Sequence, residues 1–245
     1  MVKVIGVTQA RVGSTRLPNK ILLKINDITL LEYHLVRLTK TTKVNKWIVA
    51  TTNEQGSDEI VKISNRFHFS TFKGDTENVL NRFYEAVKFE NPDYVVRVTS
   101  DCPLIDANLI DEIVSYTIDN KLDYCQTSES YPDGFDVEVF KFSDLEFANS
   151  NVKFVSDKEH VTPFIRRKAL EKEQAIIFDC TSDYKRIRLT VDEKEDFRTI
   201  QVLINKLGSN KSWIDYTQYV INNLTEFNNQ SIIRNEGFLN SLKND

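Results

Sequence analysis

Short segments rich in Val and Ile alternate with segments of helical periodicity over the first two-thirds of this chain. Three buried strands are expected, at Val4–Thr8, Trp47–Thr51 and Tyr94–Thr99. Helices are expected between and after them, at Leu30–Leu38, Asp58–Phe67, Val79–Phe89 and 109–118. Strand–helix repetition of this kind predicts right-handed βαβ units, and therefore an α/β fold with a mainly parallel sheet and helices on both faces.

The pattern changes in the last part of the chain. Asp136–Phe140 alternates polar and apolar residues and predicts a strand with one wet face. Ser143 and Glu146 have capping-box spacing, which predicts a helix start. A helix is also expected at Glu159–Lys168, although Pro163 limits it to starting near that residue. A strand is expected at Ile187–Val191, and helical structure from Glu193 onward. Because no Pro/Gly/Ser-rich linker separates these parts, we expect one domain with a small α+β insertion.

Composition excludes several classes of protein. The chain has 245 residues, 40% of them hydrophobic and 28% charged, which is typical of a soluble globular protein. Its 32 basic and 36 acidic side chains give a net charge of −4, so duplex nucleic acid is not an expected partner. No apolar run is long enough for a signal peptide or a membrane span, and a cytoplasmic location is expected. Cysteine and histidine residues are too scattered for a disulfide framework or a metal cluster.

The loop after the first expected strand concentrates groups that bind anions. It carries three cations, Arg11, Arg16 and Lys20. Gly13 allows close approach of the backbone to an anion, and the hydroxyls of Ser14 and Thr15 add donors. We expect these cations to surround an anion such as a triphosphate, since they would otherwise repel one another. A solvated turn would also explain them, and the loop matches neither GxxxxGK(S/T) nor GxGxxG.

Two aspartates follow expected strands. Asp101 comes after Tyr94–Thr99 and Asp192 after Ile187–Val191, so both belong at the carboxyl edge of the sheet, where such folds bind ligands. Carboxylates there suit Mg²⁺ that bridges to phosphate oxygens. Helix capping would also explain both residues. We interpret Asp106 as a helix cap and Asp196 as a surface acid.

Further polar residues are candidates for binding an acceptor or the nucleotide base. Asp136 and Glu138 point the same way along their strand and would accept hydrogen bonds from sugar hydroxyls, unless that face is simply solvated. His160 and Arg167, seven residues apart, share a helical face and, with Arg166, would bind a carboxylate or phosphate; a structural role is the alternative. The remaining candidates are Asn53, which would contact the base or is an ordinary turn residue, and the cations Lys73 and Arg82.

The loop also carries a recognisable motif. Residues 10–20 read ARVGSTRLPNK and resemble the ARxGSxRLPxK signature of cytidylyltransferases that make CMP-activated sugars, including the CMP-sialic acid and CMP-KDO synthetases. The resemblance is strongest to their spore-coat polysaccharide branch, SpsF. It covers about residues 3–200 and continues in order through Val49–Asn53, Thr99–Asp106, Tyr131–Val139, Glu159–Arg166 and Leu189–Phe197.

The resemblance implies a nucleotide-diphospho-sugar transferase-like, Rossmann-like fold and a homodimer. It assigns Mg²⁺ to Asp101 and Asp192, and places the acceptor pocket in the region that contains Asp136 and Glu138. His160, Arg166 and Arg167 are acceptor-binding candidates from their residue types alone. Catalytic roles fall to Arg11, Arg16 and Lys20, and nucleotide contacts to Ala10, Gly13, Ser14, Thr15, Asn53 and Asp101. One departure is that Glu193 and Lys194 follow Asp192, where KDO synthetases have Thr-Pro.

The function we expect is Mg²⁺-dependent transfer of CMP from CTP to a sugar or sugar-like acceptor, with release of pyrophosphate, for surface polysaccharide or glycoconjugate synthesis. The choice of CTP comes from the resemblance, and the acceptor is either an acidic sugar or a phosphate ester. Residues 1–120 would bind the nucleotide, residues 121–200 the acceptor and the second metal ligand, and residues 201–245 would form a helical segment. Two alternatives are a metal-dependent GT-A glycosyltransferase, which predicts an Asp-x-Asp pair on the metal, and a non-catalytic nucleotide-binding module.

Overall fold

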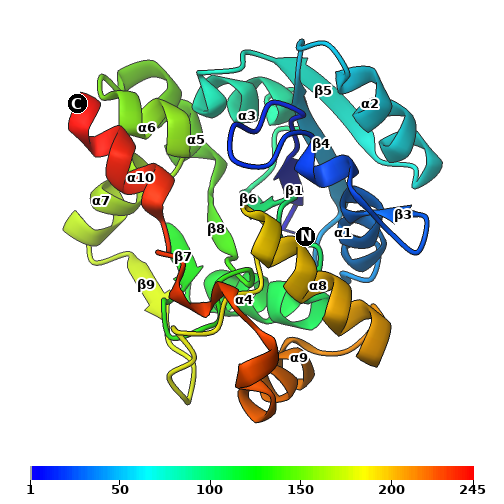
Figure 1. Ribbon diagram of the computed structural model, residues 1–245. Coiled ribbons are helices and arrows are strands. Elements are labelled where there is room, and N and C mark those ends of the chain that lie inside the picture. The colour runs from blue at the N-terminus through cyan, green and yellow to red at the C-terminus, as the bar shows by residue number, and fades with distance from the viewer. Residues whose placement is uncertain (1) are drawn as a thin grey trace.

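The computed structural model describes residues 2–245 and has the expected mainly parallel sheet with surrounding helices (Figure 1). The seven strands lie in the order β5-β4-β1-β6-β8-β7-β9. Only β8 runs antiparallel to its neighbours in this sheet. The strands are β1 (Val4–Gln9), β4 (Lys46–Thr52), β5 (Ser70–Gly74), β6 (Tyr94–Thr99), β7 (Tyr124–Thr127), β8 (Glu138–Lys141) and β9 (Ala175–Phe178), and a separate hairpin pairs β2 (Lys24–Ile25) with β3 (Ile28–Thr29).

Helices cover both faces of the sheet. One apolar core contains side chains of α1 (Leu30–Leu38), α2 (Ser57–Arg66), α4 (Ala107–Asp119), α8 (Lys194–Leu207) and α9 (Trp213–Asn222). The other contains side chains of α3 (Val79–Val87), α5 (Phe142–Asn151) and α7 (Pro163–Glu171). Along β1, Val4 belongs to the first core, whereas Ile5 and Val7 belong to the second, which explains why this strand is apolar on both faces. Two short helices, α6 (Val155–His160) and α10 (Glu236–Ser241), complete the set of α-helices described.

Single turns of 3₁₀ helix lie at Lys20–Leu22, Leu224–Glu226, Asn229–Ser231 and Leu242–Asn244. Over residues 2–245, the helices are all too short or too polar to span a lipid bilayer.

Local sequence signals explain where several helices begin. Thr29 and Glu32 form a reciprocal capping box at the start of α1, with Glu32 N donating to Thr29 Oγ1 at 3.1 Å. Asp106 accepts a hydrogen bond from Asn108 N at 2.8 Å and caps α4, which confirms its interpretation as a cap. Asp101 lies upstream of this cap, so capping of α4 does not account for it.

Four expected elements differ from the structure in their bounds or their nature. The strand expected at Asp136–Phe140 is present but begins at Glu138, and the helix expected from Ser143 is present but begins at Phe142, without the predicted side-chain cap. The helix expected at Glu159–Lys168 begins at Pro163, as this proline predicts, and forms α7. The residues before it belong to a separate helix, α6, because Val161 has a φ of 72° and breaks the helical path. The segment Ile187–Val191 is not a strand of the sheet.

Instead of joining the sheet, the segment Ile187–Val191 is held by loops. Leu189 N donates to Asp133 O at 2.7 Å, and Val191 N donates to Asp101 O at 2.8 Å. Gly134 makes this close approach possible, since it has a φ of 112° and a Cβ added there would lie 2.6 Å from the Leu189 carbonyl carbon. The loop that carries Asp133 is thereby joined to the segment that leads to Asp192.

We predict that Gly134→Ala lowers the free energy of unfolding by about 2–4 kcal/mol, because the new Cβ meets backbone at a strained φ. Chemical denaturation would measure the loss. Gly237→Ala is the matched control, since a Cβ at that helical position meets nothing within 4 Å; its stability should be unchanged or higher by up to about 1 kcal/mol. Equal stability of the two variants would contradict the prediction.

Candidate active site

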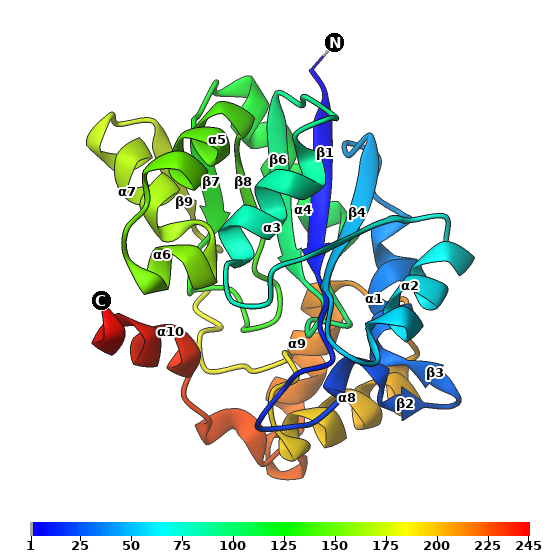
Figure 2. The same ribbon diagram turned by 90° about the horizontal axis from the view of Figure 1, so that it is seen from above.

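Two cavities meet at the carboxyl end of the sheet. The larger, of about 920 Å³, lies beside the loop that follows β1, and the smaller, of about 320 Å³, lies beside β8 and the α6–α7 junction. Asp101, Asp192, Arg16 and His160 line both cavities. Figure 2 shows that the loop after β1 and helix α10 lie at this same end of the strands. The two predicted metal ligands, Asp101 and Asp192, therefore lie where the two cavities meet. This arrangement suits the transfer of a group between two molecules, because each molecule would occupy one cavity.

The larger cavity collects nearly all of the residues predicted to contact a nucleotide. Its lining includes Ala10, Arg11, Gly13, Ser14, Thr15, Arg16, Lys20 and Asp101. Buried Val12 anchors the loop, and its carbonyl accepts hydrogen bonds from Ser14 N at 3.0 Å and Asn19 N at 3.3 Å. Asn53 is exposed and lines neither cavity. A contact between Asn53 and the base therefore has no support from this arrangement.

The ammonium of Lys20 lies between the two aspartates. Lys20 Nζ is 2.8 Å from Asp101 Oδ2 and 2.7 Å from Asp192 Oδ1. Burial alone would lower the pKa of Lys20, but the two carboxylates outweigh it and raise that pKa. Burial likewise opposes ionisation of Asp101, yet Lys20 holds its pKa well below the usual range. Lys20 and Asp101 are therefore both charged at neutral pH.

The loop cations are partly neutralised by the chain itself, which the sequence analysis did not anticipate. Arg16 lies 3.1 Å from Asp192, 3.7 Å from Glu193 and 3.6 Å from Glu236. Side-chain carboxylates thus supply some of the anions that we expected from a ligand alone. Among the residues described, Arg11 has no ion-pair partner, and its guanidinium remains open to the larger cavity.

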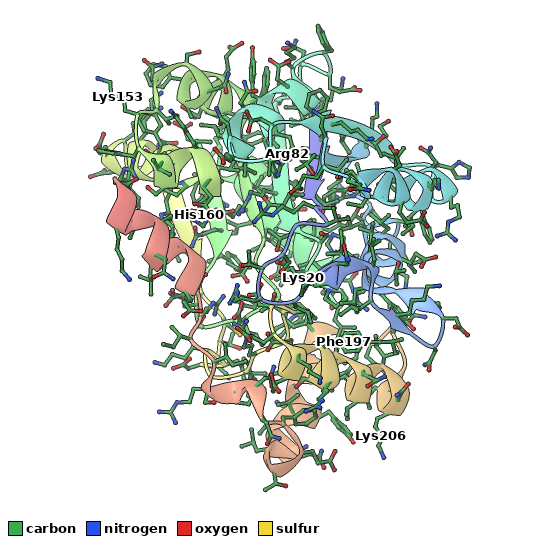
Figure 3. All side chains as sticks on the ribbon, turned by 45° about the horizontal axis from the view of Figure 1, so that its top comes forward. Lys20, Arg82, Lys153, His160, Phe197 and Lys206 are labelled. Carbon is green, nitrogen blue, oxygen red and sulfur yellow. The ribbon has the colours of Figure 1, made fainter. Side chains whose placement is uncertain are left out.

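Arg82 is a second guanidinium that faces Arg11. It is almost fully buried in α3, lines the larger cavity and donates to the carbonyl oxygen of Asp75. Burial and the nearby charge of Arg11 lower its pKa to about 10. Within residues 2–245 its Nε has no hydrogen-bond partner. Figure 3 shows Arg82, Lys20 and His160 around the centre of the molecule, whereas Lys153 and Lys206 lie at its edge.

Lys73, the other cation considered with Arg82, does not join the site. Its Nζ is 2.5 Å from the exposed carboxylate of Asp58, and it lines neither cavity. The pairing explains its position on the surface.

The residues at the border suit a magnesium ion that arrives with a phosphate. Asp101 and Asp192 offer hard oxygen ligands close enough to share one cation, as their contacts with Lys20 Nζ demonstrate. Over residues 2–245 there is no group of three or more His, Cys, Asp or Glu side chains arranged to hold a metal. Mg²⁺ is commonly bound by one or two carboxylates, with water and substrate phosphates completing its shell. The donor set fits that mode rather than a site made entirely by protein.

Behind Asp192 lies a buried guanidinium that the sequence analysis missed. Arg188 is 4% exposed and lies 2.6 Å from Asp133, 3.1 Å from Asp192 and 2.9 Å from Asp196. Asp196 was interpreted as a surface acid; this is wrong, because its side chain is 0% exposed. Asp196 also accepts hydrogen bonds from the backbone N–H groups of Asp192 and Glu193, and it thereby orients Asp192.

The smaller cavity contains both acids predicted to face an acceptor, Asp136 and Glu138. Glu138 is largely occupied by protein partners: it accepts hydrogen bonds from Arg97, from Tyr124 Oη at 2.6 Å and from Thr162 Oγ1 at 2.5 Å. Burial opposes its ionisation, but these partners hold its pKa below the usual value. Asp136 is half-exposed and pairs with Arg234 at 2.6 Å. The two acids therefore differ in their freedom to bind a ligand.

The break at Val161 separates the cationic candidates. Because α6 ends at His160, that residue and Arg167 do not share a helical face, contrary to expectation. Arg167 donates to both oxygens of Asp157, at 2.9 and 2.7 Å, and lines neither cavity. Arg166 lines the smaller cavity and, among the described residues, has no ion-pair partner.

His160 lies between the two cavities. Burial and the charge of Arg97 lower its pKa to about 4, so its ring is neutral at pH 7. Its Nε2 is buried without a hydrogen-bond partner among residues 2–245. A neutral ring with a free polar atom suits a hydrogen bond to a ligand.

The sequence profile of the cytidylyltransferase family matches residues 5–223. The chain belongs to this family. Members are nucleotidyltransferases, so this chain is one too, and its predicted resemblance to cytidylyltransferases is confirmed. The spore coat polysaccharide biosynthesis protein SpsF of Bacillus subtilis is 30% identical over 84% of this chain and 88% of its own length.

Two other relatives match over a large part of the chain. An uncharacterised protein of Methanocaldococcus jannaschii is 41% identical over 80% of this chain and 81% of its own length. The solved structure of a cytidylyltransferase from Leptospira borgpetersenii has a TM-score of 0.88 and 31% identity, covering 96% of this chain and all of the other. This likeness confirms the predicted fold class of the cytidylyltransferase family.

We predict that Arg188→Met lowers the free energy of unfolding by about 3–5 kcal/mol at pH 8, because buried Asp133 and Asp196 lose their cation. Burial already raises the pKa of Asp133 to about 7 in the wild-type protein, and loss of the Arg188 guanidinium raises it further. The folded variant therefore binds protons more tightly than the folded wild-type protein, and the deficit shrinks as the pH falls. Denaturation at pH 8 and pH 5 would measure this.

The control is Arg198→Met. Arg198 is exposed, and its ion pair with Glu195 is long, at 3.9 Å. Loss of Arg198 should therefore change the free energy of unfolding by less than about 0.5 kcal/mol at either pH. A deficit in Arg188→Met that stays constant with pH would contradict the assignment of buried, unpaired carboxylates.

Proposed function

We propose that this nucleotidyltransferase transfers CMP from CTP to a sugar or sugar-like acceptor and releases pyrophosphate, with Mg²⁺ as cofactor. The observation that carries the proposal is the meeting of a cation-lined cavity and a smaller mixed cavity at Asp101 and Asp192. The product would be an activated sugar for surface polysaccharide or glycoconjugate synthesis.

In this proposal the triphosphate of CTP occupies the larger cavity. Arg11, Arg16 and Lys20 neutralise charge that develops on the departing pyrophosphate, and Arg82 adds a fourth cation. Asp101 and Asp192 would hold Mg²⁺, which supplies further charge neutralisation at phosphate oxygens when it is bound. Phosphoryl-type transfer needs mainly alignment and charge stabilisation, so no nucleophilic side chain is required.

The acceptor would occupy the smaller cavity, whose volume suits a small molecule. The acceptor's hydroxyl oxygen forms a bond to the α-phosphorus of CTP. The bond between this phosphorus and the oxygen that bridges to the β-phosphate breaks, pyrophosphate leaves with that oxygen, and the hydroxyl proton passes to solvent. Arg166 would bind an acidic group of the acceptor, and neutral His160 would hydrogen-bond to it. Asp136 is the acid best able to accept hydrogen bonds from acceptor hydroxyls, because Glu138 already has three protein donors.

We assign roles to the three parts of the chain from the residues that each part contributes to the two cavities. Residues 1–120 supply most of the nucleotide side, and residues 121–200 supply most of the acceptor side and Asp192. Residues 201–245 do more than form a helical segment, since Glu236 and Gly237 line both cavities.

The position of Asp106 weighs against the glycosyltransferase alternative. That function predicts two neighbouring acids on the metal, but Asp106 caps α4 and accepts a hydrogen bond from Trp213 N at 2.8 Å. Asp106 lines neither cavity, whereas Asp101, the preceding acid in the sequence, lines both.

Pyrophosphate release with a panel of nucleoside triphosphates and acceptors, with Mg²⁺ or EDTA, tests the proposed function. We expect release to require CTP, Mg²⁺ and an acidic sugar or phosphate ester. Lys20→Ala should lower turnover by about 10²–10³-fold, because a preorganised charge contact is lost. Lys73→Ala, which removes a lysine outside both cavities, should retain turnover. A folded Lys20→Ala protein with full turnover would refute the role of Lys20.

Neighbouring arginines offer a matched test of the acceptor side. With an acceptor found in that panel, Arg166→Gln should raise the KM for the acceptor by about 10- to 100-fold, because a hydrogen bond to a charged group is lost, and leave the KM for CTP unchanged. Arg167→Gln should leave both KM values unchanged, although it lowers stability by depriving buried Asp157 of its partner. The assignment fails if the two variants have the same acceptor KM.

A further inference from the structure

The segment Ile233–Ser241, which we call the cleft strap, contributes to the lining of both cavities, which together we call the cleft. Its residues Ile233, Asn235, Glu236, Gly237 and Phe238 line the smaller cavity, and Glu236, Gly237 and Asn240 line the larger one. Figure 1 shows α10, in red, beside α6 and across from the loop that follows β1. The strap lies beyond residue 223, where the match to the family profile ends. The features of the strap are therefore not assigned by that match.

Polar contacts fasten the strap on either side of the cleft. Before α10, Arg234 lies 2.6 Å from Asp136 and donates to the carbonyl oxygen of Tyr131 at 3.0 Å. After α10, Asp245 accepts hydrogen bonds from Ser156 N and Oγ at the start of α6. Between these points, the ring of Phe238 packs edge-on against His160, with 5.0 Å between centroids. The strap thus forms one wall of the proposed acceptor site.

In the middle of the strap, Glu236 reaches the nucleotide side of the cleft. Its carboxylate lies 3.6 Å from Arg16, which also faces Asp192 and Glu193. The three acids are not held equally. Asp192 is fixed by Lys20 and Arg188, and Glu193 takes part in the capping box of α8. Glu236 is 48% exposed, and in the described part of the chain its only ion-pair partner is Arg16.

Glu236 is therefore the acid that a bound polyphosphate would displace most easily. A phosphate on Arg16 competes for the same guanidinium N–H groups and repels a carboxylate placed beside it. Leaving Arg16 costs Glu236 little, because half-exposed ion pairs are weak and water can solvate the released carboxylate. Since Glu236 is part of the strap, its displacement removes the contact that ties the strap to the loop after β1.

We propose that Glu236 is a positioning residue that couples the acceptor wall to the nucleotide. Without nucleotide, the Glu236–Arg16 ion pair adds one contact with the loop after β1 to the contacts that Arg234 and Asp245 make elsewhere. CTP at Arg16 breaks this ion pair and loosens the middle of the strap, so the wall of the acceptor cavity becomes more mobile once the nucleotide has bound. The inference rests on the proposed function only in requiring that the CTP phosphates contact Arg16. It adds a link between the bound nucleotide and the acceptor wall, made by a residue outside the region that the family profile matches.

The test combines titration of CTP with Mg²⁺ by calorimetry and hydrogen exchange of peptides that cover residues 233–241. CTP should increase exchange of the strap in the wild-type protein. Glu236→Gln should increase that exchange without CTP and tighten CTP binding by about two- to five-fold at low salt, the size expected for loss of one competing half-exposed ion pair. The gain in affinity should shrink at high salt.

Two control variants separate the coupling from general effects. Glu193→Gln removes the same charge at 3.7 Å from Arg16 and keeps a hydrogen-bond acceptor for the α8 cap. It should tighten CTP binding but leave strap exchange at the wild-type level. Leu239→Ala changes an exposed strap residue that lines neither cavity and should alter neither measurement.

The outcomes distinguish the two proposals. If CTP binds but leaves strap exchange unchanged, or if Glu236→Gln matches the wild-type protein in both readouts, the coupling is overturned and the proposed transferase function stands. If the wild-type protein does not bind CTP, both proposals are overturned. An equal rise in strap exchange for Glu193→Gln and Glu236→Gln would also overturn the coupling, because the effect would then come from charge alone.

Discussion

One ammonium group joins parts of this chain that are far apart in sequence. Lys20 Nζ contacts Asp101 and Asp192, which lie 81 and 172 residues away, and these contacts gather the loop after β1, the end of β6 and the start of α8 into one site. Two carboxylates this close would repel each other without a cation between them. The border between the two cavities depends on that charge balance, and so does the fit to Mg²⁺.

Behind this contact, the fold fixes the aspartates by different means. Asp101 follows a central parallel strand, and Asp192 follows an extended segment that only loops hold. Arg188 and Asp196 complete the support of Asp192 from the protein interior. Of the three acids around the Arg188 guanidinium, Asp133 and Asp196 are buried, and a buried acid that loses its partner destabilises the fold. In contrast, Glu236 is half-exposed and reaches Arg16, in the loop after β1, from the strap.

Much of the fold was predictable because buried parallel strands have a strong sequence signature. β1, β4 and β6 and the helices α1, α3 and α4 lie where apolar runs and helical periodicity placed them. β5, β7 and β9 were missed, because they are short and carry polar residues or lie toward an edge of the sheet. Within the site, the loop motif led to the residues of the larger cavity. Arg167 and Asp196 were misread, since which way an arginine turns or whether an aspartate is buried depends on distant partners.

By itself, the sequence determined the class of fold, the loop with three cations and the position of two aspartates after expected strands. Each of these features lies in a short continuous segment and can be recognised without the rest of the chain. Only the tertiary structure decided which charges face one another: that Lys20 sits between Asp101 and Asp192, that Arg166 rather than Arg167 enters a cavity, and that Glu236 reaches Arg16. Ion pairs act over a few ångströms in space, and no spacing along the chain records that distance.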